Sequence, residues 1–230
     1  MGTLQEHCVS VVIPTLNAVG DLAAAIGDAR QSPLVHEIIV ADGGSRDATC
    51  TIAAENGAAV LLAPRGRGPQ LAAGAAAASG AWLLFLHADC RMAAGWDAAM
   101  LGFIAADRAQ ERAGYFDFVL DDAAPAARRL ESIVAWRCRV LALPYGDQGL
   151  LISRALYDRV GGFAPIPLME DVDLIRRLGR RRLSRLGTAI LVSSRRYRRD
   201  GYIRRPLRNL CCLSLYLAGV APARIVRLYG

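Results

Sequence analysis

The chain contains no lysine, so all 28 of its positively charged side chains, histidine aside, are arginines. Thirteen of them lie in residues 176–208, where Asp200 is the only acid, so this arginine-rich region has a local charge of +12 and the rest of the chain is net acidic. Genome composition and a need for bidentate phosphate contacts both explain an all-arginine set, and both stay open.

Paired cysteines and a secretion signal are also missing. The six cysteines are scattered without a C-x-x-C pair, a pattern that indicates neither zinc nor a disulfide framework and is typical of a reducing compartment. The segment from Met1 to His7 has no basic leader and no small-residue cleavage site, which disfavours a signal peptide. We therefore expect a cytoplasmic protein.

The chain has no apolar run that is long enough to span a membrane. Its last apolar segment, residues 207–226, contains Asn209, Pro222 and Arg224 and falls short of the roughly 20 apolar residues that a span requires. The sequence predicts a docked helix or an oligomer face here, as in a homodimer. Peripheral association with the inner face of a membrane is the alternative.

The composition and the periodicity of the chain indicate one α/β domain over residues 1–230. The 230 residues are 53% hydrophobic and 21% charged, with no repeat or linker. Short apolar runs alternate with alanine-rich helical stretches, as in parallel strands joined by crossover helices. The expected strands are Val9–Ile13, stopped by Pro14, then Glu37–Ala41, Ala59–Leu62, Trp82–Leu86, Tyr115–Leu120 and Leu150–Ser153. The expected helices include Leu22–Arg30, Asp47–Asn56, Gln70–Ser79 and Ala126–Leu141.

Two aspartates follow predicted strands. Asp42 precedes Gly-Gly-Ser after the second strand, and Asp89 follows the most apolar strand. Ligands of open α/β sheets bind beyond the carboxyl ends of the strands, so we expect a site there. Asp42 can accept hydrogen bonds from a base or ribose, and Asp89 suits a hard divalent cation that also binds phosphate oxygens. The alternatives are an Asx turn at Asp42 and a helix or turn cap at Asp89.

A glycine-rich loop with two guanidiniums, residues 64–70, precedes a predicted helix whose N-terminus favours an anion. The loop lacks the G-K-[ST] of a P-loop, and it does not complete G-x-G-x-x-G, because Gly66 and Gly68 are followed next by Gly74. It is either a phosphate-binding element or an exposed basic turn.

Three acids, Glu170, Asp171 and Asp173, lie at the start of another predicted helix. The helix macrodipole alone favours carboxylates in a first turn. The functional interpretation is that one of them accepts the proton of a hydroxyl nucleophile as a general base.

In this order, these segments resemble the nucleotide-sugar glycosyltransferases of family 2, which have the GT-A fold. The matching segments are Val11–Asn17, Asp42–Asp47, Arg67–Gly74, Leu86–Asp89, Gly161–Phe163 and Glu170–Asp173. Each motif is weak alone, but their joint order is specific. The segments that resemble a bacterial subgroup often labelled as arsenosugar-biosynthesis-type glycosyltransferases are His87–Asp89, Pro144–Gly149 and Leu168–Asp171. That label identifies no substrate.

The resemblance implies a Rossmann-like, mostly parallel central sheet flanked by helices. The nucleotide-sugar half would cover about residues 8–120, the acceptor half about 121–200 and a C-terminal helical segment about 203–230. Asp42 would contact the base, usually uracil, Asp89 would bind Mg²⁺ or Mn²⁺ as the last acid of the D-x-D motif, and Asp171 would be the general base. The other residues implied to bind the nucleotide or the substrates are Pro14, Thr15, Asn17, Arg67, Gln70, Asp147 and Glu170.

The implied reaction is an inverting, metal-dependent transfer of a sugar from a nucleoside diphosphate, with UDP favoured, to an unidentified acceptor. A cation at Asp89 and the Arg67 guanidinium would stabilise charge on the leaving group, while Asp171 activates the acceptor from the opposite face. His87 replaces the first acid of D-x-D and is either a metal ligand or a satisfied strand-end histidine. The Q-x-x-R-W motif of processive synthases is absent, which favours single transfer. The arginine-rich region would face a phosphorylated acceptor or an anionic membrane.

Two other functions use some of the same features. A nicotinamide-dependent oxidoreductase would use the alternating sheet and the glycines of 66–74, but their incomplete pattern speaks against it. A nucleic-acid-binding module would use the arginine-rich region, but Asp42 and Asp89 would repel phosphate unless a metal intervenes. We therefore expect no nucleic acid partner.

Overall fold

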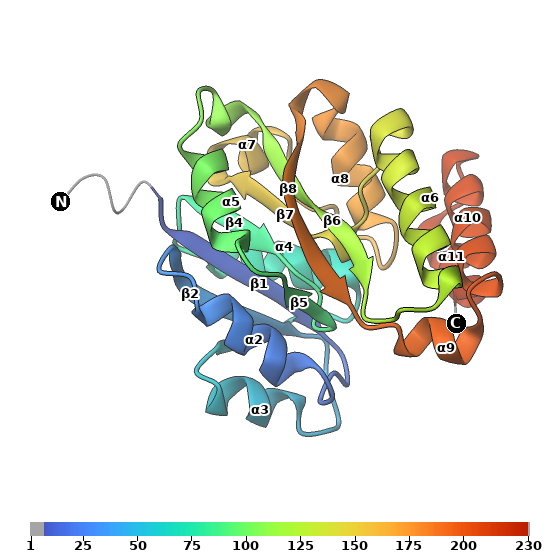
Figure 1. Ribbon diagram of the computed structural model, residues 1–230. Coiled ribbons are helices and arrows are strands. Elements are labelled where there is room, and N and C mark those ends of the chain that lie inside the picture. Colours follow the sequence, from blue (N-terminus) through green and yellow to red (C-terminus); the bar gives the residue numbers. More distant parts are fainter. Residues whose placement is uncertain (1–6, 230) are drawn as a thin grey trace.

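The computed structural model describes residues 7–229, so most of the N-terminal segment that was expected to lack a signal peptide lies outside the described residues. The described strands form one eight-stranded mixed sheet in the order β3-β2-β1-β4-β7-β6-β8-β5 (Figure 1). The strands are β1 Val9–Thr15, β2 Val35–Asp42, β3 Ala59–Leu62, β4 Trp82–Phe85, β5 Cys90–Met92, β6 Ala113–Leu120, β7 Leu150–Ser153 and β8 Leu183–Val192. This is the α/β, GT-A-like architecture that the sequence predicted.

Helices cover both faces of the sheet (Figure 1). The helices are α2 Leu22–Arg30, α3 Thr49–Glu55, α4 Arg67–Ala77, α5 Trp96–Ile104, α6 Pro125–Leu141, α7 Arg154–Arg159, α8 Glu170–Leu178, α9 Arg195–Asp200, α10 Arg204–Leu217 and α11 Pro222–Tyr229. Side chains of α2, α5 and α6 pack on one face, and side chains of α4, α7 and α8 pack on the other. Within residues 7–229, no helix is long and apolar enough to cross a bilayer.

The first half of the sheet is parallel because each strand returns through a crossover helix. Strands β3, β2, β1 and β4 pair in parallel through α2, α3 and α4. Strand β4 is buried along its whole length, and its side chains alternate between the two cores, with Trp82 in one and Leu83 in the other. This burial on both faces explains why its sequence is a continuous apolar run.

The second half of the sheet is mixed. Strand β7 is antiparallel to both β4 and β6, β8 is parallel to β6, and β5 is antiparallel to β8. The sequence did not predict β8, which runs through the arginine-rich region. Its polar positions are accommodated by cross-strand pairing, as where the Arg185 guanidinium lies 2.5 Å from the Asp117 carboxylate of β6.

We had expected strand β1 to stop at Pro14, but it continues to Thr15. The carbonyl of Val12 accepts a hydrogen bond from the N–H of Leu86, so Pro14, two residues further, faces the same side. Strand β4 ends at Phe85, so no partner strand on that side needs the N–H that proline lacks. Pro14 therefore costs the sheet no ladder hydrogen bond.

The C-terminal segment forms two helices, α10 and α11, which confirms the C-terminal helical segment that was predicted. Gly219, with φ of +85°, lies in the turn between them, and Pro222 is the first residue of α11. Both helices contribute to a small core with Leu168, Met169 and Val172. The C-terminal helices are thereby held against the start of α8.

Candidate functional site

A cleft opens beyond the carboxyl ends of β1 and β4. Its wide lobe is lined by residues that follow these two strands, by the first turn of α4 and by side chains of α9, α10 and α11. A narrower lobe extends toward the start of α8. The two lobes share Arg67, His87, Asp89, Ser193, Arg196, Arg205 and Tyr229, so they form one continuous site.

The structure brings most of the predicted site residues to this cleft. Pro14, Thr15, Asn17, Arg67, Gln70 and Asp89 line the wide lobe, and Arg67, Asp89, Asp147 and Asp171 line the narrow lobe. Two predicted residues, Asp42 and Glu170, line neither lobe.

Asp42 uses its carboxylate to close the loop after β2. One oxygen accepts from the hydroxyls of Thr15, at 2.9 Å, and Ser45, and the other accepts from the N–H groups of Gly44 at 2.9 Å and Ser45 at 2.7 Å. Burial opposes ionisation, but these hydrogen bonds lower the pKa of the Asp42 carboxyl below its ordinary value. The structure therefore shows the Asx turn that the sequence offered as the alternative, and a contact with a base stays a prediction.

Gln70 and Asn17 hold together the loops that line the wide lobe. The Gln70 amide donates to the carbonyls of Thr15 at 2.6 Å and Ala41 at 2.8 Å, which ties α4 to the ends of β1 and β2. The Asn17 side chain accepts from the N–H of Arg46 at 2.9 Å. Both residues therefore shape the site through the backbone of their neighbours.

The glycine-rich loop is exposed at Pro64 and Arg65 and continues directly into helix α4. Helix α4 begins at Arg67, three residues before the predicted start, so the Arg67 side chain extends from the first helical turn into both lobes. Gly68 packs tightly under this turn: an added Cβ would lie 2.2 Å from the carbonyl oxygen of Ala164. Close backbone packing thus fixes where Arg67 enters the cleft.

Arg67 lies among acidic groups. Desolvation disfavours its charge, but Tyr229, Glu170, Asp171 and Asp89 together raise its pKa further above the ordinary range. The guanidinium also lies 5.9 Å from the centre of the Tyr229 ring. Arg67 is therefore a fixed positive charge between the acids of the two lobes.

Asp89 lies on the turn after β4 and faces α9. Its carboxylate is 3.7 Å from the Arg196 guanidinium, and its backbone carbonyl accepts from the N–H of Ser193 at 3.1 Å. Within residues 7–229, no group of three or more His, Cys, Asp or Glu side chains is arranged to hold a metal ion. One carboxylate fits a divalent cation that takes its remaining ligands from substrate phosphates and water.

His87 is neutral at physiological pH. Desolvation and the nearby Arg67 charge lower its pKa to about 4. An added Cβ at Gly146 would lie 2.7 Å from the His87 Nε2 atom, so the glycine permits close approach of the ring. A neutral imidazole beside Asp89 retains a lone pair for a cation, which is compatible with the ligand interpretation.

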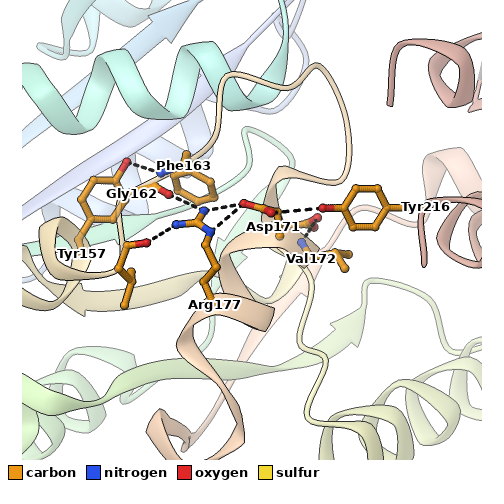
Figure 2. Close-up of polar contacts among 9 residues, drawn as sticks. Tyr157, Gly162, Phe163, Asp171, Val172, Arg177 and Tyr216 are labelled. Carbon is orange, nitrogen blue, oxygen red and sulfur yellow. Dashed lines mark hydrogen bonds and ion pairs between the residues drawn. The ribbon is translucent and has the colours of Figure 1, made fainter. Parts of the chain in front are cut away.

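Asp171 lies in the first turn of α8 and points into the narrow lobe. Its carboxylate accepts from the N–H of Gly146 at 2.8 Å. It also accepts from the N–H of Val172 at 2.7 Å (Figure 2). Asp173 lies two residues further and is held elsewhere, 2.6 Å from the Arg177 guanidinium and 3.3 Å from the Tyr216 hydroxyl. Only the first of these two aspartates lines the cleft.

The neighbouring acids are partly neutralised by burial. Glu170 is completely buried with no hydrogen-bond partner for either carboxylate oxygen among the described residues, and burial together with the Asp171 charge raises its pKa to about 8. Burial likewise raises the pKa of Asp147 to about 6, against the opposing effect of Arg137. Glu170 is therefore mostly protonated at neutral pH.

The family model described as "Glycosyl transferase family 2" matches residues 10–165, about two thirds of the chain. The chain belongs to glycosyl transferase family 2. The matched range covers β1 to α7 and ends before Glu170, so it includes Asp89 and leaves Asp171 outside. No curated protein matches the chain.

Solved structures confirm the fold of this family 2 glycosyltransferase. Glucosyl-3-phosphoglycerate synthase from Mycobacterium tuberculosis, in complex with Mn²⁺, UDP and glucosyl-3-phosphoglycerate, is similar at 22% identity with a TM-score of 0.57, over 81% of this chain and 74% of that one. The same enzyme with Mn²⁺, UDP-glucose and phosphoglyceric acid gives 21% identity and a TM-score of 0.58 over the same shares. Its complex with Mg²⁺ and UDP gives 22% and 0.56 over 81% and 73%.

Several cleft residues of this glycosyltransferase were not predicted individually. Arg196, Tyr197 and Arg205 belong to the arginine-rich region, which was noted only as a whole, and Asn209 and Tyr229 lay in segments without a recognised motif. Arg205 is buried, and three guanidiniums, those of Arg199, Arg205 and Arg208, approach the single Asp200 carboxylate at 2.7 to 3.3 Å. The local excess of positive charge was the available signal.

Proposed function

We propose that this family 2 enzyme transfers a sugar from a nucleoside diphosphate, with UDP favoured, to a hydroxyl acceptor with inversion at the anomeric carbon. The observation that carries the proposal is that Arg67, Asp89 and Asp171, from three distant segments, all line the narrow lobe. A positive charge, a cation-binding carboxylate and a carboxylate base are the groups that this reaction requires.

The wide lobe is the proposed donor site. The loops after β1 and the first turn of α4 meet there, and Arg67 extends from that turn. Breaking the bond between sugar and diphosphate leaves negative charge on the leaving group, and the Arg67 guanidinium is placed to stabilise it. In this role Asp89, with His87 beside it, would hold a divalent cation that neutralises diphosphate oxygens when bound.

The narrow lobe is the proposed acceptor site, with Asp171 as the base. Glu170 is mostly protonated at neutral pH, so it is a poor proton acceptor there, and Asp173 is engaged by Arg177. Asp171 is the acid of this helix start that lines the lobe. Hydrogen bonds from Gly146 and Val172 fix its orientation, as a positioned general base requires.

The donor and cation classes are supported by likeness rather than by contacts in this chain. Glucosyl-3-phosphoglycerate synthase was solved with Mn²⁺ and UDP-glucose and with Mg²⁺ and UDP, and we extend a UDP-type donor and Mg²⁺ or Mn²⁺ to this chain. The resemblance to the arsenosugar-biosynthesis-type subgroup stays a prediction, and the acceptor is not assigned.

A thermal-shift panel of nucleoside diphosphates, with and without Mn²⁺, tests the proposal. A ligand at 100 times its dissociation constant adds about 2.7 kcal/mol to the apparent free energy of unfolding. We expect the largest shift with UDP and Mn²⁺ together. Equal shifts for all nucleotides, or no shift with metal present, would count against the donor assignment.

A further inference from the structure

Helix α10 turns an apolar stripe to solvent. Ile203, which precedes its first residue, and Leu207, Leu210 and Leu217 are 73%, 59%, 57% and 51% exposed. Their spacings of four, three and seven residues place them on one helical face. We call these four residues the α10 stripe. An apolar helix face normally points into a core, so this one lacks a partner within the described residues.

The opposite face of α10 is the one that packs on the protein. Arg205, Cys212 and Leu213 are buried there, and Arg205, Asn209 and Leu213 line the narrow lobe. One helix therefore has the cleft on one side and the stripe on the other. The two are separated by about one helix diameter, on the order of 10 Å.

The charged residues of the C-terminal segment that carries the stripe are all of one sign, and Asp200 of α9 pairs with two of them, Arg205 and Arg208. Residues 201–230 contain five arginines and no acid. Arg204, Arg224 and Arg227 are exposed, and none of them forms an ion pair within the part of the chain that the structure describes. A second copy of the chain docked stripe to stripe would bring like charges together, whereas an anionic lipid surface would neutralise them.

A second helix exposes apolar side chains as well. Ile133 and Trp136 of α6 are 61% and 52% exposed. Helices α6 and α10 both lie at the end of the molecule away from β2 and α3 (Figure 1). Tryptophan is enriched at membrane interfaces, where its ring lies at the level of the headgroups.

We propose that the α10 stripe docks on an anionic bilayer surface, with Arg204, Arg224 and Arg227 at the lipid phosphates. Since no described helix can cross a bilayer, α10 lies in the plane of the interface. Docking in this way holds the cleft within about one helix diameter of the headgroups. The proposal does not depend on which sugar the enzyme transfers.

Co-sedimentation of the full chain with vesicles tests the docking surface. We expect binding to vesicles of equal parts phosphatidylglycerol and phosphatidylcholine, weakened by salt, and much weaker binding to phosphatidylcholine alone. Replacing Leu207 and Leu210 together by serine should weaken binding by roughly tenfold or more, because their exposed apolar surface no longer enters the interface. The matched control is Leu101→Ser on α5, which is 45% exposed in the folded chain and should bind as the unaltered protein does.

A second variant tests the charge. Removing Arg224 and Arg227 by Arg224→Gln and Arg227→Gln should weaken binding to anionic vesicles by about 30-fold, at about 1 kcal/mol for each charge. Neither side chain lines the cleft. Equal binding to neutral and anionic vesicles would overturn the proposal. So would a dimer in sedimentation experiments that the double leucine variant dissociates, because the stripe would then be covered by a second copy.

Discussion

The substitution Asp171→Asn tests the proposed base with little change in the shape of the side chain. Asparagine cannot accept the proton of the acceptor hydroxyl, so turnover should fall by roughly 10²-fold or more. In the unaltered chain, one carboxylate oxygen of Asp171 accepts a hydrogen bond from Gly146 and the other accepts one from Val172. Asparagine keeps only one acceptor oxygen. The lost hydrogen bond should lower the free energy of unfolding by about 1 kcal/mol. Donor affinity should hardly change, because Asp171 does not line the wide lobe.

The matched control is Asp173→Asn, the same chemical change two residues further along α8. Asp173 pairs with Arg177 and Tyr216 and does not line the cleft, so its loss should cost about 1 kcal/mol of stability or less for such a half-exposed pair. Turnover is measured as nucleoside diphosphate release with an acceptor that supports the unaltered enzyme, and donor affinity by calorimetry. The base assignment is refuted if both variants keep near-normal turnover, or if both lose it equally.

Three further substitutions test the metal ligand, the packing of Gly68 and the burial of Glu170. Asp89→Asn should abolish the Mn²⁺ dependence of nucleotide binding in calorimetry without unfolding the chain, and unchanged dependence would place any metal elsewhere. Gly68→Ala should lower the free energy of unfolding in a denaturant titration by about 1–3 kcal/mol, since its Cβ would lie 2.2 Å from the Ala164 carbonyl oxygen. The pKa of Glu170 in the folded state, about 8, exceeds its ordinary value of 4.5, so the folded state gains stability as pH falls from 8 to 4.5. The variant Glu170→Gln should therefore be more stable than the unaltered chain at pH 8 and equally stable below pH 4.5. A stability difference that does not depend on pH would contradict the assigned burial effect.

The parallel half of the fold could be predicted because local pattern determines it. The helix Leu22–Arg30 and the strand Ala59–Leu62 have the bounds that the sequence predicted, as does the strand Leu150–Ser153 in the mixed half. Strand β8 was missed because its pairing with β6, as between Arg185 and Asp117, depends on distant residues. Strand β5, with three residues, is too short to leave a periodic signal.

The candidate site also has residues that could be predicted from the sequence and residues that could not. Arg67, Asp89 and Asp171 could be proposed together because their motifs occur in a recognisable order, and the structure places all three in one cleft. Tyr229 could not, because it reaches the cleft only through the docking of α11, which depends on contacts between distant segments. The four hydrogen bonds at Asp42 also required the folded loop before a turn could be distinguished from a ligand contact.

The configuration of the product tests the proposed inverting mechanism. With an α-linked nucleoside diphosphate sugar, Mn²⁺ and an acceptor found by screening, the anomeric proton of the product can be followed by NMR. We expect a β-linked product together with one released nucleoside diphosphate, because Asp171 activates the acceptor from the face opposite the leaving group. An α-linked product would contradict the inverting mechanism and the role of Asp171 with it.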